Sequence, residues 1–448
     1  MKLLWHMPTL RRVSCGLSIR AINFARRLAA VGHDLTFAVA RDKTDCHGAD
    51  IAGLPLIHLD VPPRPPAHWA LQSLERVRMA RVAVSQLALD VDVLITCQPE
   101  AVIAFKERTD RPVVFVCGGT TLLHDAADAK RRRRDTSSLR HLMSAPAYAI
   151  DRRLKRRNER RGFSLADACV FDSASTRDRV IAEYAINGDK SHAIRGAVDI
   201  DAFRPPTAAE RADARAAYGL DDNTMMLAWT GRLSPEKNLE TLIRAIPLCR
   251  RRQLRLILAG DGPERGRLEE LVSAIEARAL AVGDDTRTRS VQFLRDVDDV
   301  RPLLHAADLF VFPSVSESLG LSLIEAMACN LPAIALRSDG DRVRNAAAEI
   351  LDDGRCGALV EQNTPEAFAA EIVRLLDSAD QRANLALAAR RRAVTFFDWT
   401  AASRDFESLI THFICRSKGQ AKSLSEKGAT HEGVSGAFAE CASETASV

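Results

Sequence analysis

The sequence has few aromatic residues, since Phe, Trp and Tyr together make up 5% of its 448 residues. This scarcity argues against an aromatic-rich sugar-binding lectin and against an RNA binder that stacks bases on aromatic side chains. The ten cysteines include no Cys-x-x-Cys pair, and several lie in apolar segments, such as Cys117, Cys169 and Cys329. We therefore expect buried, reduced thiols in a cytosolic protein rather than a disulfide framework or a zinc site.

Long apolar runs and a strong charge of one sign are also missing. No uninterrupted stretch reaches the ~18 apolar residues of a membrane-spanning helix, and the apolar run near the N-terminus is too short for a signal peptide. The net charge is only +4, from 63 Lys+Arg against 59 Asp+Glu, which gives no support to a general nucleic-acid binder. We expect a cytoplasmic protein with no nucleic-acid partner.

Short apolar runs alternate with helical patterns in both halves of the chain. This alternation predicts an α/β fold with mostly parallel sheets wrapped by helices. The length predicts two or three domains, or one large architecture with two cores. Strands are predicted at Lys2–Met7, Asp34–Ala40, Leu56–Leu59, Val91–Thr96, Pro112–Cys117 and Ala168–Phe171, and then at Met225–Trp229, Leu254–Ala259, Val291–Leu294, Asp308–Phe312 and Ala333–Leu336.

The predicted boundary between two Rossmann-like domains lies near residue 204. Pro205 and Pro206 interrupt regular structure there, which separates a domain at 1–204 from a second at 205–398. From residue 417 to residue 448 the sequence is small, polar and aperiodic, which predicts a disordered tail.

Two candidate ligand-binding segments follow the first two predicted strands of the second domain. In the first segment the strand ends at Gly231, and a helix is predicted over Pro235–Arg250. Arg232 and Lys237 lie on either side of the start of this helix. Two cations beside a helix start form a natural diphosphate site, although a solvated surface pair is the competing interpretation. The second segment is a turn with Gly260 and Gly262, and such turns usually serve only geometry.

Two more segments lie after the next strands, at the same predicted edge of the sheet. Arg295 and Val297 follow a strand, in a loop that could present backbone groups to a nucleobase. The strongest segment holds Glu317 in a loop after a strand and Glu325 eight residues later on a largely apolar helix, with Gly320 where that helix starts. We expect Glu325 to be only partly exposed, so that its carboxylate needs a partner, and a ligand hydroxyl is one candidate. An ordinary surface Glu is the alternative.

Several motifs in order resemble the retaining GT-B glycosyltransferases of family 4. The resemblance covers about residues 166 to 413, and more loosely the N-terminus. The motifs are ADACVFDSASTRDRVI, GAVDIDAFRP, GRLSPEKNLETLIRA, LILAGDGPE, AADLFVFPSVSESLGLSLIEAMACNLPAIA, DGRCGALV and FFDWTAAS. The resemblance implies two Rossmann-like domains facing each other, with a final helix at about 399–416 that packs back onto the first domain.

The resemblance also implies a role for each candidate residue toward a nucleotide-sugar donor. Arg232 and Lys237 would hold the diphosphate beside Gly231, and Glu317 would contact the hydroxyls of the transferred sugar. Glu325 would hold the ribose. The remaining donor contacts would come from backbone groups at Leu319, Gly320 and Leu321, from Arg295 and Val297 beside the base, and from Gly16 of the first domain.

The implied reaction is glycosyl transfer with retained anomeric configuration and without a metal or other cofactor. Two cations and a helix dipole can replace the metal that other glycosyltransferases hold in a DxD motif. The DxD-like runs here, at 90–92, 199–201, 296–298 and 339–341, lie mostly in turns or at strand edges, which favours capping roles. UDP-sugars are the favoured donors, and the implied acceptor is a glycan, a glycolipid or a small molecule. The expected products are cell-surface polysaccharides or glycoconjugates.

Three positions depart from the family pattern. A His near the sugar often follows the strand equivalent to Pro112–Cys117, and His124 is the candidate for that place. Cys15 replaces one of two adjacent glycines in the first-domain loop, and Arg295 stands where a Gly is common. These departures leave open a non-catalytic GT-B protein that binds sugar nucleotide or membrane. A GT-B epimerase or phosphorylase is the other alternative, against which Glu317 and Glu325 argue.

One basic stretch stands apart from these motifs. Residues Lys130–Arg161 hold 13 Lys/Arg against three acidic residues, so their net charge of +10 exceeds the +4 of the whole chain. Such a stretch can dock on anionic lipid and so place the protein peripherally on the inner face of the cell membrane. A solvated helical face is the equally weighted alternative.

Overall fold

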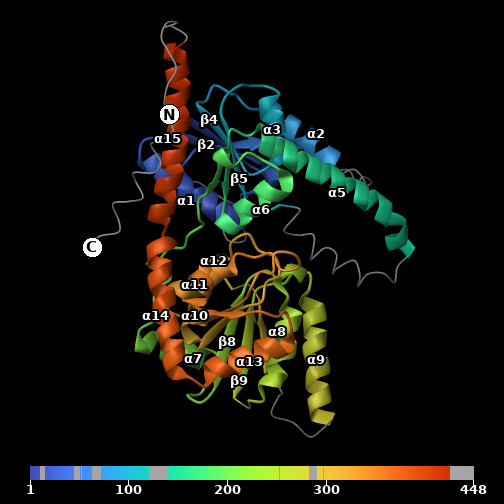
Figure 1. Ribbon diagram of the computed structural model, residues 1–448, viewed down its shortest axis with the longest axis vertical. Helices are drawn as coiled ribbons and strands as arrows, with labels where there is room; N and C mark the ends of the chain where they lie inside the picture. The colour runs from blue at the N-terminus through green and yellow to red at the C-terminus, as the bar shows by residue number, and fades with distance from the viewer. Residues whose placement is uncertain are drawn as a thin grey trace. The chain divides into compact units, whose positions relative to one another are not determined.

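The computed structural model describes residues 1–10, 16–44, 51, 53–62, 72–120, 139–251, 253–281, 290–295 and 297–423. Its coordinates divide into a unit at Met1–Glu407 and a unit at Ser408–Val448, and the description below concerns the first unit. Two parallel sheets form this unit (Figure 1).

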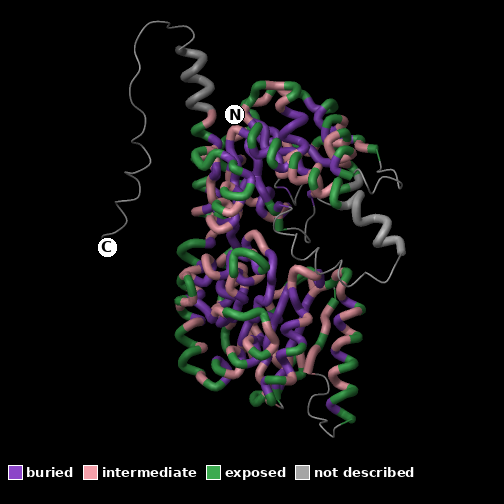
Figure 2. The backbone as a smooth tube through the Cα atoms, turned by 45° about the vertical axis from the view of Figure 1, so that its right-hand side comes forward, coloured by how far each residue is buried: buried purple, intermediate pink, exposed green. Residues whose placement is uncertain are grey.

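The first sheet contains seven parallel strands among the described residues, in the order β3-β2-β1-β4-β5-β6-β7. Because helices cover both faces, the central strands are almost wholly buried and read as continuous apolar runs (Figure 2). The strands are β1 (Lys2–Met7), β2 (Asp34–Ala40), β3 (Leu56–Leu59), β4 (Val93–Thr96), β5 (Val113–Cys117), β6 (Ala168–Phe171) and β7 (Ser191–Ala193).

The helices of this half follow the strands as crossover connections. Helices α2, α3 and α5 pack together on one side of the sheet. Ser173 caps α6, since its side chain accepts a hydrogen bond from the Thr176 amide. The helices are α1 (Gly16–Ala30), α2 (Gln72–Ser85), α3 (Pro99–Lys106), α5 (Leu139–Leu165) and α6 (Ala174–Tyr184), with short 3-10 turns at η1 (Arg41–Lys43) and η3 (Gly188–Lys190).

Within the described ranges, the second sheet contains six parallel strands, in the order β10-β9-β8-β11-β12-β13. Successive residues of one strand face opposite sides, so Met226 and Ala228 join one apolar core while Leu227 and Trp229 join the other. The strands are β8 (Met225–Thr230), β9 (Leu254–Ala259), β10 (Val291–Leu294), β11 (Leu309–Phe312), β12 (Ala333–Leu336) and β13 (Ala358–Val360).

Helices cover both faces of this sheet as well. The helices of this half are α7 (Ala208–Ala217), α8 (Leu239–Ala245), α9 (Arg265–Ala281), α10 (Arg301–Ala306), α11 (Leu321–Ala328), α12 (Ala347–Ile350), α13 (Pro365–Leu376) and α14 (Ala379–Phe396), with 3-10 turns at η4 (Pro235–Lys237), η5 (Ile246–Cys249) and η7 (Asp352–Gly354). A last helix, α15 (Trp399–Ser423), follows them. The prediction of two Rossmann-like α/β halves with parallel sheets is confirmed. The boundary at 204/205 stays a prediction.

Near residue 399 the chain returns to the first sheet. Trp399 packs edge-on against Phe24 of α1, and Phe406 stacks on the same ring with centroids 4.5 Å apart. Glu407 pairs with Arg27 at 3.4 Å. The helix α15 continues to Ser423 and so includes residues 417–423 that the sequence analysis placed in the tail, whereas 424–448 lie outside the described residues.

One predicted helix differs clearly from the structure. The segment predicted as a single helix, Pro235–Arg250, is divided into η4, α8 and η5. The division lies at Asn238, which adopts a left-handed conformation with φ of 54° and is almost completely buried. Asn tolerates this conformation because its short polar side chain can bond nearby groups. The break lies directly after Lys237.

Candidate functional site

The second sheet has a topological switch point between β8 and β11. From β8 the chain proceeds outward through β9 and β10, and then returns to the other side of β8 with β11. In open α/β sheets, ligands bind at the carboxyl ends of the strands at such a point. The loops that leave these two strands, residues 231–238 and 313–320, therefore define the candidate site.

Glycines allow the first of these loops to pack closely on its neighbour. Gly231 has a φ of 147°, and its amide donates to the Ala259 carbonyl at 3.0 Å. A Cβ added at Gly260 would lie 1.9 Å from the Gly231 carbonyl oxygen. The glycine turn after β9 thus supports the loop that carries Arg232, which agrees with the geometric interpretation of that turn.

Asn238 joins the two loops of the site. Its side-chain nitrogen donates to the Pro313 carbonyl at 3.2 Å and to Asn363 Oδ1 at 2.7 Å, and its side-chain oxygen accepts from Thr241 at 3.0 Å. The Val315 amide donates to the Glu236 carbonyl at 2.9 Å, which adds a backbone tie between the same loops. Asn238 was not among the predicted site residues, because Pro313 and Asn363, its partners in the second loop and beyond, are more than 70 residues away in the sequence.

Lys237 and Glu317 form an ion pair across the switch point. Their side chains are 18% and 21% exposed, so the pair lies at the surface but is mostly withdrawn from solvent. Arg232 is exposed, and its guanidinium group has no hydrogen-bond or ion-pair partner within the described ranges. The predicted residues Lys237 and Glu317 are therefore in direct contact, and the guanidinium group of Arg232 lies exposed on the same loop as Lys237.

Helix α11 begins where the second loop ends. Gly320 precedes it with a φ of 109° and offers no side-chain cap, and a Cβ at this position would lie 2.7 Å from the Phe312 ring. The first turn contains no acidic residue. The leading amides of a helix have no partner inside the helix, so the start at Leu321 can bind an anion.

Glu325 lies one turn further along α11, on a helix whose other side chains are largely buried. The residue is half-buried, and no hydrogen bond or ion pair of its carboxyl group occurs within the part of the chain that is described. Withdrawal of the carboxyl group from water raises the pKa of Glu325 to about 7. This carboxyl group is thus one that a ligand hydroxyl could satisfy.

Residues of the first half contact the beginning of α11. A Cβ added at Gly16 would lie 3.1 Å from Leu321 Cδ1, and one at Gly196 would lie 2.5 Å from Leu319 Cδ2. Gly16, Leu319 and Leu321, all predicted donor-site residues, are therefore close together. Cys15 and His124 lie outside the described residues.

The two residues predicted to flank a base lie further along the sheet edge. Arg295 is exposed directly after β10, and Val297 is partly buried against the apolar core. Neither has a contact with Lys237 or Glu317 in the described part of the chain. Their roles stay predictions.

Three of the DxD-like runs have structural roles. Asp199 accepts hydrogen bonds from the amides of Asp201 and Ala202, and Asp339 accepts from three amides at 341–343. Asp92 accepts from the Lys2 amide at 3.0 Å. Asp296 of the fourth run lies outside the described residues. These contacts agree with the capping roles predicted for such runs.

The first sheet has its own switch point between β1 and β4. His6 and Thr96 lie there side by side, with His6 Nδ1 3.1 Å from the Thr96 hydroxyl, and burial lowers the pKa of His6 to about 4. Burial also raises the pKa of Glu100, just beyond β4. An uncharged imidazole and a buried carboxyl group thus lie near this edge.

The chain matches known proteins over most of its length. A model described as "Glycosyltransferase Family 4" matches residues 15–202, and one described as "Glycosyl transferases group 1" matches residues 224–378. The alpha-maltose-1-phosphate synthase of Mycolicibacterium smegmatis is 30% identical over 249 residues, which is 54% of this chain and 62% of that protein. The chain therefore aligns with less than two thirds of that relative.

Solved structures share the fold. Sucrose-phosphate synthase from Thermosynechococcus elongatus superposes with a TM-score of 0.71 at 18% identity, covering 93% of this chain and all of that one. The Anabaena protein HepE in complex with UDP-glucose gives a TM-score of 0.63 at 18% identity, covering 92% and 100%. The structural likeness shows the GT-B fold, and the two family matches, which together span most of the chain, show that it belongs to the family 4, or group 1, glycosyltransferases.

Proposed function

We propose that the protein is a retaining glycosyltransferase that moves a sugar from a nucleotide-diphosphate sugar to a hydroxyl group of an acceptor. The observation that carries this proposal is the Lys237–Glu317 pair at the carboxyl ends of β8 and β11, with the exposed Arg232 on the same loop. UDP-sugars are the favoured donors. The support for this choice is the complex of HepE with UDP-glucose, a protein with the same fold.

The charges of the site match a donor that carries a diphosphate and a sugar. Lys237 and Arg232 would bind the diphosphate together with the start of α11, while Glu317 would accept hydrogen bonds from sugar hydroxyls. The donor would thus bridge the two members of the ion pair. In the reaction, the bond from the anomeric carbon to the phosphate oxygen breaks and its electron pair leaves on the nucleoside diphosphate.

The acceptor completes the transfer on the same face of the sugar. Its hydroxyl oxygen bonds to the anomeric carbon, and its proton passes to the departing phosphate oxygen, so the anomeric configuration is retained. The two cations and the α11 dipole stabilise the charge that develops on the diphosphate. We propose that they do so without a metal ion or other cofactor.

Glu325 is proposed to bind the ribose of the donor. A carboxylate can accept hydrogen bonds from both ribose hydroxyls, and the Glu325 carboxyl group has no partner in the described residues. Its raised pKa implies that the free carboxyl group is partly protonated near neutral pH. Ribose hydroxyls would favour the ionised form and lower that pKa.

The acceptor is proposed to be a glycan, a glycolipid or a small molecule, supplied in part at an anionic membrane surface. On α5 the residues Arg153, Arg157, Arg160 and Arg161 are exposed. Two apolar side chains near these arginines are also exposed, Ile150 at 53% and Leu74 at 50%. Their sequence neighbours are hydrogen-bonded, because the Ser73 amide donates to the Asp151 carboxylate at 2.7 Å.

An apolar pair beside exposed arginines suits the boundary between lipid headgroups and acyl chains. Six further basic residues of the stretch lie between Lys130 and Arg140, and their side chains lie outside the described residues. No helix in the described ranges combines the length and apolar character that crossing a bilayer requires.

The experiment that tests the proposed function is a panel of UDP-, GDP- and ADP-sugars. Thermal stabilisation reports binding, and release of the nucleotide reports turnover. We expect a UDP-sugar to stabilise the wild type and to be turned over. Lys237→Ala should abolish turnover while the fold is retained, whereas Arg391→Ala, an exposed arginine on α14, should not. Stabilisation without turnover for every donor would favour the non-catalytic alternative.

A further inference from the structure

Three side chains of the first half hold the loop that carries Glu317. The Ser318 carbonyl accepts hydrogen bonds from the Ser173 hydroxyl at 2.7 Å and from the Thr176 hydroxyl at 3.1 Å. The Ser318 hydroxyl donates to Asp172 Oδ2 at 3.1 Å. The residue next to Glu317 is therefore bound on both its backbone and its side chain.

These three side chains are themselves fixed. Ser173 is completely buried and caps α6. Asp172 pairs with Arg20, which is 3% exposed and also donates to the Ile194 carbonyl at 2.8 Å. Burial lowers the pKa of Arg20 to about 10, so its guanidinium group stays charged at neutral pH. The first half thus offers a rigid set of hydrogen-bonding groups to Ser318.

The same loop is tied to the second half on the other side of Glu317. The Glu317 amide donates to the Arg344 carbonyl at 3.1 Å, and the Arg344 amide donates to the Val315 carbonyl at 2.7 Å. Adjacent Cα atoms are ~3.8 Å apart, so a displacement of Ser318 must move Glu317 as well. The position of the Glu317 carboxylate then depends on both anchors.

We propose that Asp172, Ser173 and Thr176 are positioning residues that place the Glu317 carboxylate for the reaction by holding Ser318. The inference rests on the proposed function, because it assigns these residues to the site of glycosyl transfer. Beyond the proposed function, it states that turnover requires the contacts of the first half with Ser318, because these contacts order the part of the site where Glu317 would bind the transferred sugar. Loss of these contacts would impair turnover more than nucleotide binding, since the nucleotide contacts other residues.

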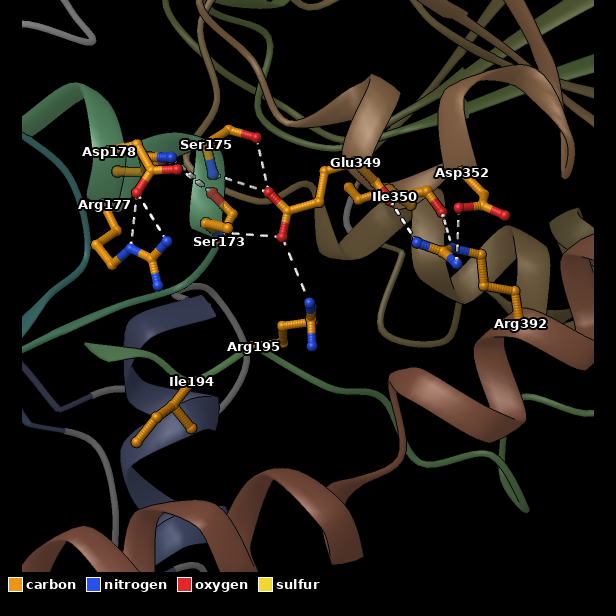
Figure 3. A network of polar contacts seen from close by, with 12 residues as sticks. Ser173, Ser175, Arg177, Asp178, Ile194, Arg195, Glu349, Ile350, Asp352 and Arg392 are labelled. Carbon is orange, nitrogen blue, oxygen red and sulfur yellow. Dashed lines mark hydrogen bonds and ion pairs between the residues drawn. The ribbon is translucent and has the colours of Figure 1, made fainter. Parts of the chain in front are cut away.

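A second contact at the same helix end serves as a matched comparison. The Glu349 carboxylate accepts from the amides of Ala174 and Ser175 at 3.0 and 2.9 Å and from the Ser175 hydroxyl at 2.7 Å, and it lies 3.6 Å from Arg195 (Figure 3). Burial opposes ionisation of this carboxyl group, but the hydrogen bonds from Ser175 and Ala174 outweigh burial and lower the pKa of Glu349.

Glu349 also joins the two halves, yet it lies on α12 and not on the Glu317 loop. Removal of the Ser175 hydroxyl therefore tests cohesion between the halves without touching Ser318. Removal of the Thr176 hydroxyl tests the contact with Ser318.

The experiment compares four variants with the wild type: Thr176→Val, Ser318→Ala, the double variant of both, and the control Ser175→Ala. Hydrogen exchange of residues 316–322 in the free protein reports order of the loop. Initial rates of UDP release from UDP-glucose, or from the best donor found, report kcat, and titration with UDP reports nucleotide affinity. Thr176→Ser, which keeps the hydroxyl, tests rescue.

We expect faster exchange of residues 316–322 and a loss in kcat of about fivefold for each single variant, since one net hydrogen bond contributes about 1 kcal/mol. The double variant should lose about 30-fold in kcat, with a clearly smaller loss of UDP affinity. Thr176→Ser and Ser175→Ala should behave as the wild type. Unchanged exchange in the double variant, or an equal loss of kcat in Ser175→Ala, would overturn the inference.

Failure of the proposed function and failure of the positioning role give different results in these experiments. If the wild type turns over no donor, the proposed function fails, and the exchange data still decide whether the first half orders the Glu317 loop. If the double variant loosens the loop but keeps full kcat, the proposed function stands and the positioning role is refuted.

Discussion

The raised pKa of Glu325 makes the stability of the free protein depend on pH in a specific way. The folded carboxyl group titrates at about 7 instead of its ordinary 4.5. Between these values the folded protein keeps a proton that the unfolded chain has released, so stability falls as the pH rises through this window. A rise from 4.5 to about 7 corresponds to about 3 kcal/mol, which is an upper limit because Glu325 keeps some contact with solvent.

Glu325→Gln removes this titration while keeping the shape of the side chain. At pH 8 the variant should unfold at a higher temperature than the wild type. The difference is at most roughly 6 to 12 °C, if 1 kcal/mol moves the midpoint of a domain of this size by about 2–4 °C. Near pH 4.5 the two proteins should unfold at the same temperature. Scanning calorimetry across pH 4.5–8 measures both.

Donor binding should show the opposite trend. If the carboxylate accepts hydrogen bonds from the ribose, the affinity of the wild type for UDP-glucose should rise about tenfold from pH 6 to pH 8, with proton release on binding. In Glu325→Gln the affinity should be weaker and independent of pH. Calorimetry in buffers of different ionisation enthalpy measures the released protons. A Gln variant that is no more stable at pH 8, together with pH-independent binding to the wild type, would refute the reasoning.

The remaining predictions concern four other features. Lys237→Ala should abolish measurable turnover, because removing a single preorganised charge-stabilising group lowers kcat by about 10²–10³-fold, and an unchanged rate in the nucleotide-release assay would contradict its role. Asn238→Ala should lower the free energy of unfolding by roughly 2–4 kcal/mol, because buried groups lose their hydrogen-bond partner and an Ala must adopt the left-handed conformation. Asn238→Gly should lower it less, because Gly adopts this conformation without strain. Arg157→Glu on α5 should weaken binding to phosphatidylcholine vesicles containing phosphatidylglycerol by about 30-fold, at about 1 kcal/mol per charge, and Arg391→Glu should not; equal binding to neutral and anionic vesicles would reject the membrane proposal. EDTA should leave turnover unchanged, and loss of activity restored by Mg²⁺ would contradict metal independence.

Much of the fold could be predicted from the sequence because strands buried on both faces are continuous apolar runs. Leu254–Ala259 and Ala333–Leu336 have the predicted bounds for this reason. The short edge strand β7, with its polar Ser191 and His192, carries no such signal. The break at Asn238 could not be predicted either, because the surrounding sequence has a helical pattern. The partners that stabilise the break, Pro313 and Asn363, are distant in sequence.

The candidate site could be predicted only in part for the same physical reason. Residues that follow strands at one sheet edge, such as Lys237 and Glu317, can be brought together from topology alone. The hydrogen bonds of Asp172 and Thr176 with Ser318 depend on how the two halves contact each other, and no local sequence pattern predicts that contact. The side chain of Ser318 looks like an ordinary loop hydroxyl in the sequence.

The proposed reaction is transfer of a sugar with retained configuration at the Lys237–Glu317 site. Proton NMR of the sugar first released from a UDP-α-sugar, recorded before mutarotation, tests it most directly, because slow transfer to water needs no knowledge of the acceptor. The wild type should release the α-anomer first, and Lys237→Ala should release none above the background without enzyme. Initial release of the β-anomer, or release of the same sugar by Lys237→Ala at the wild-type rate, would contradict the claim.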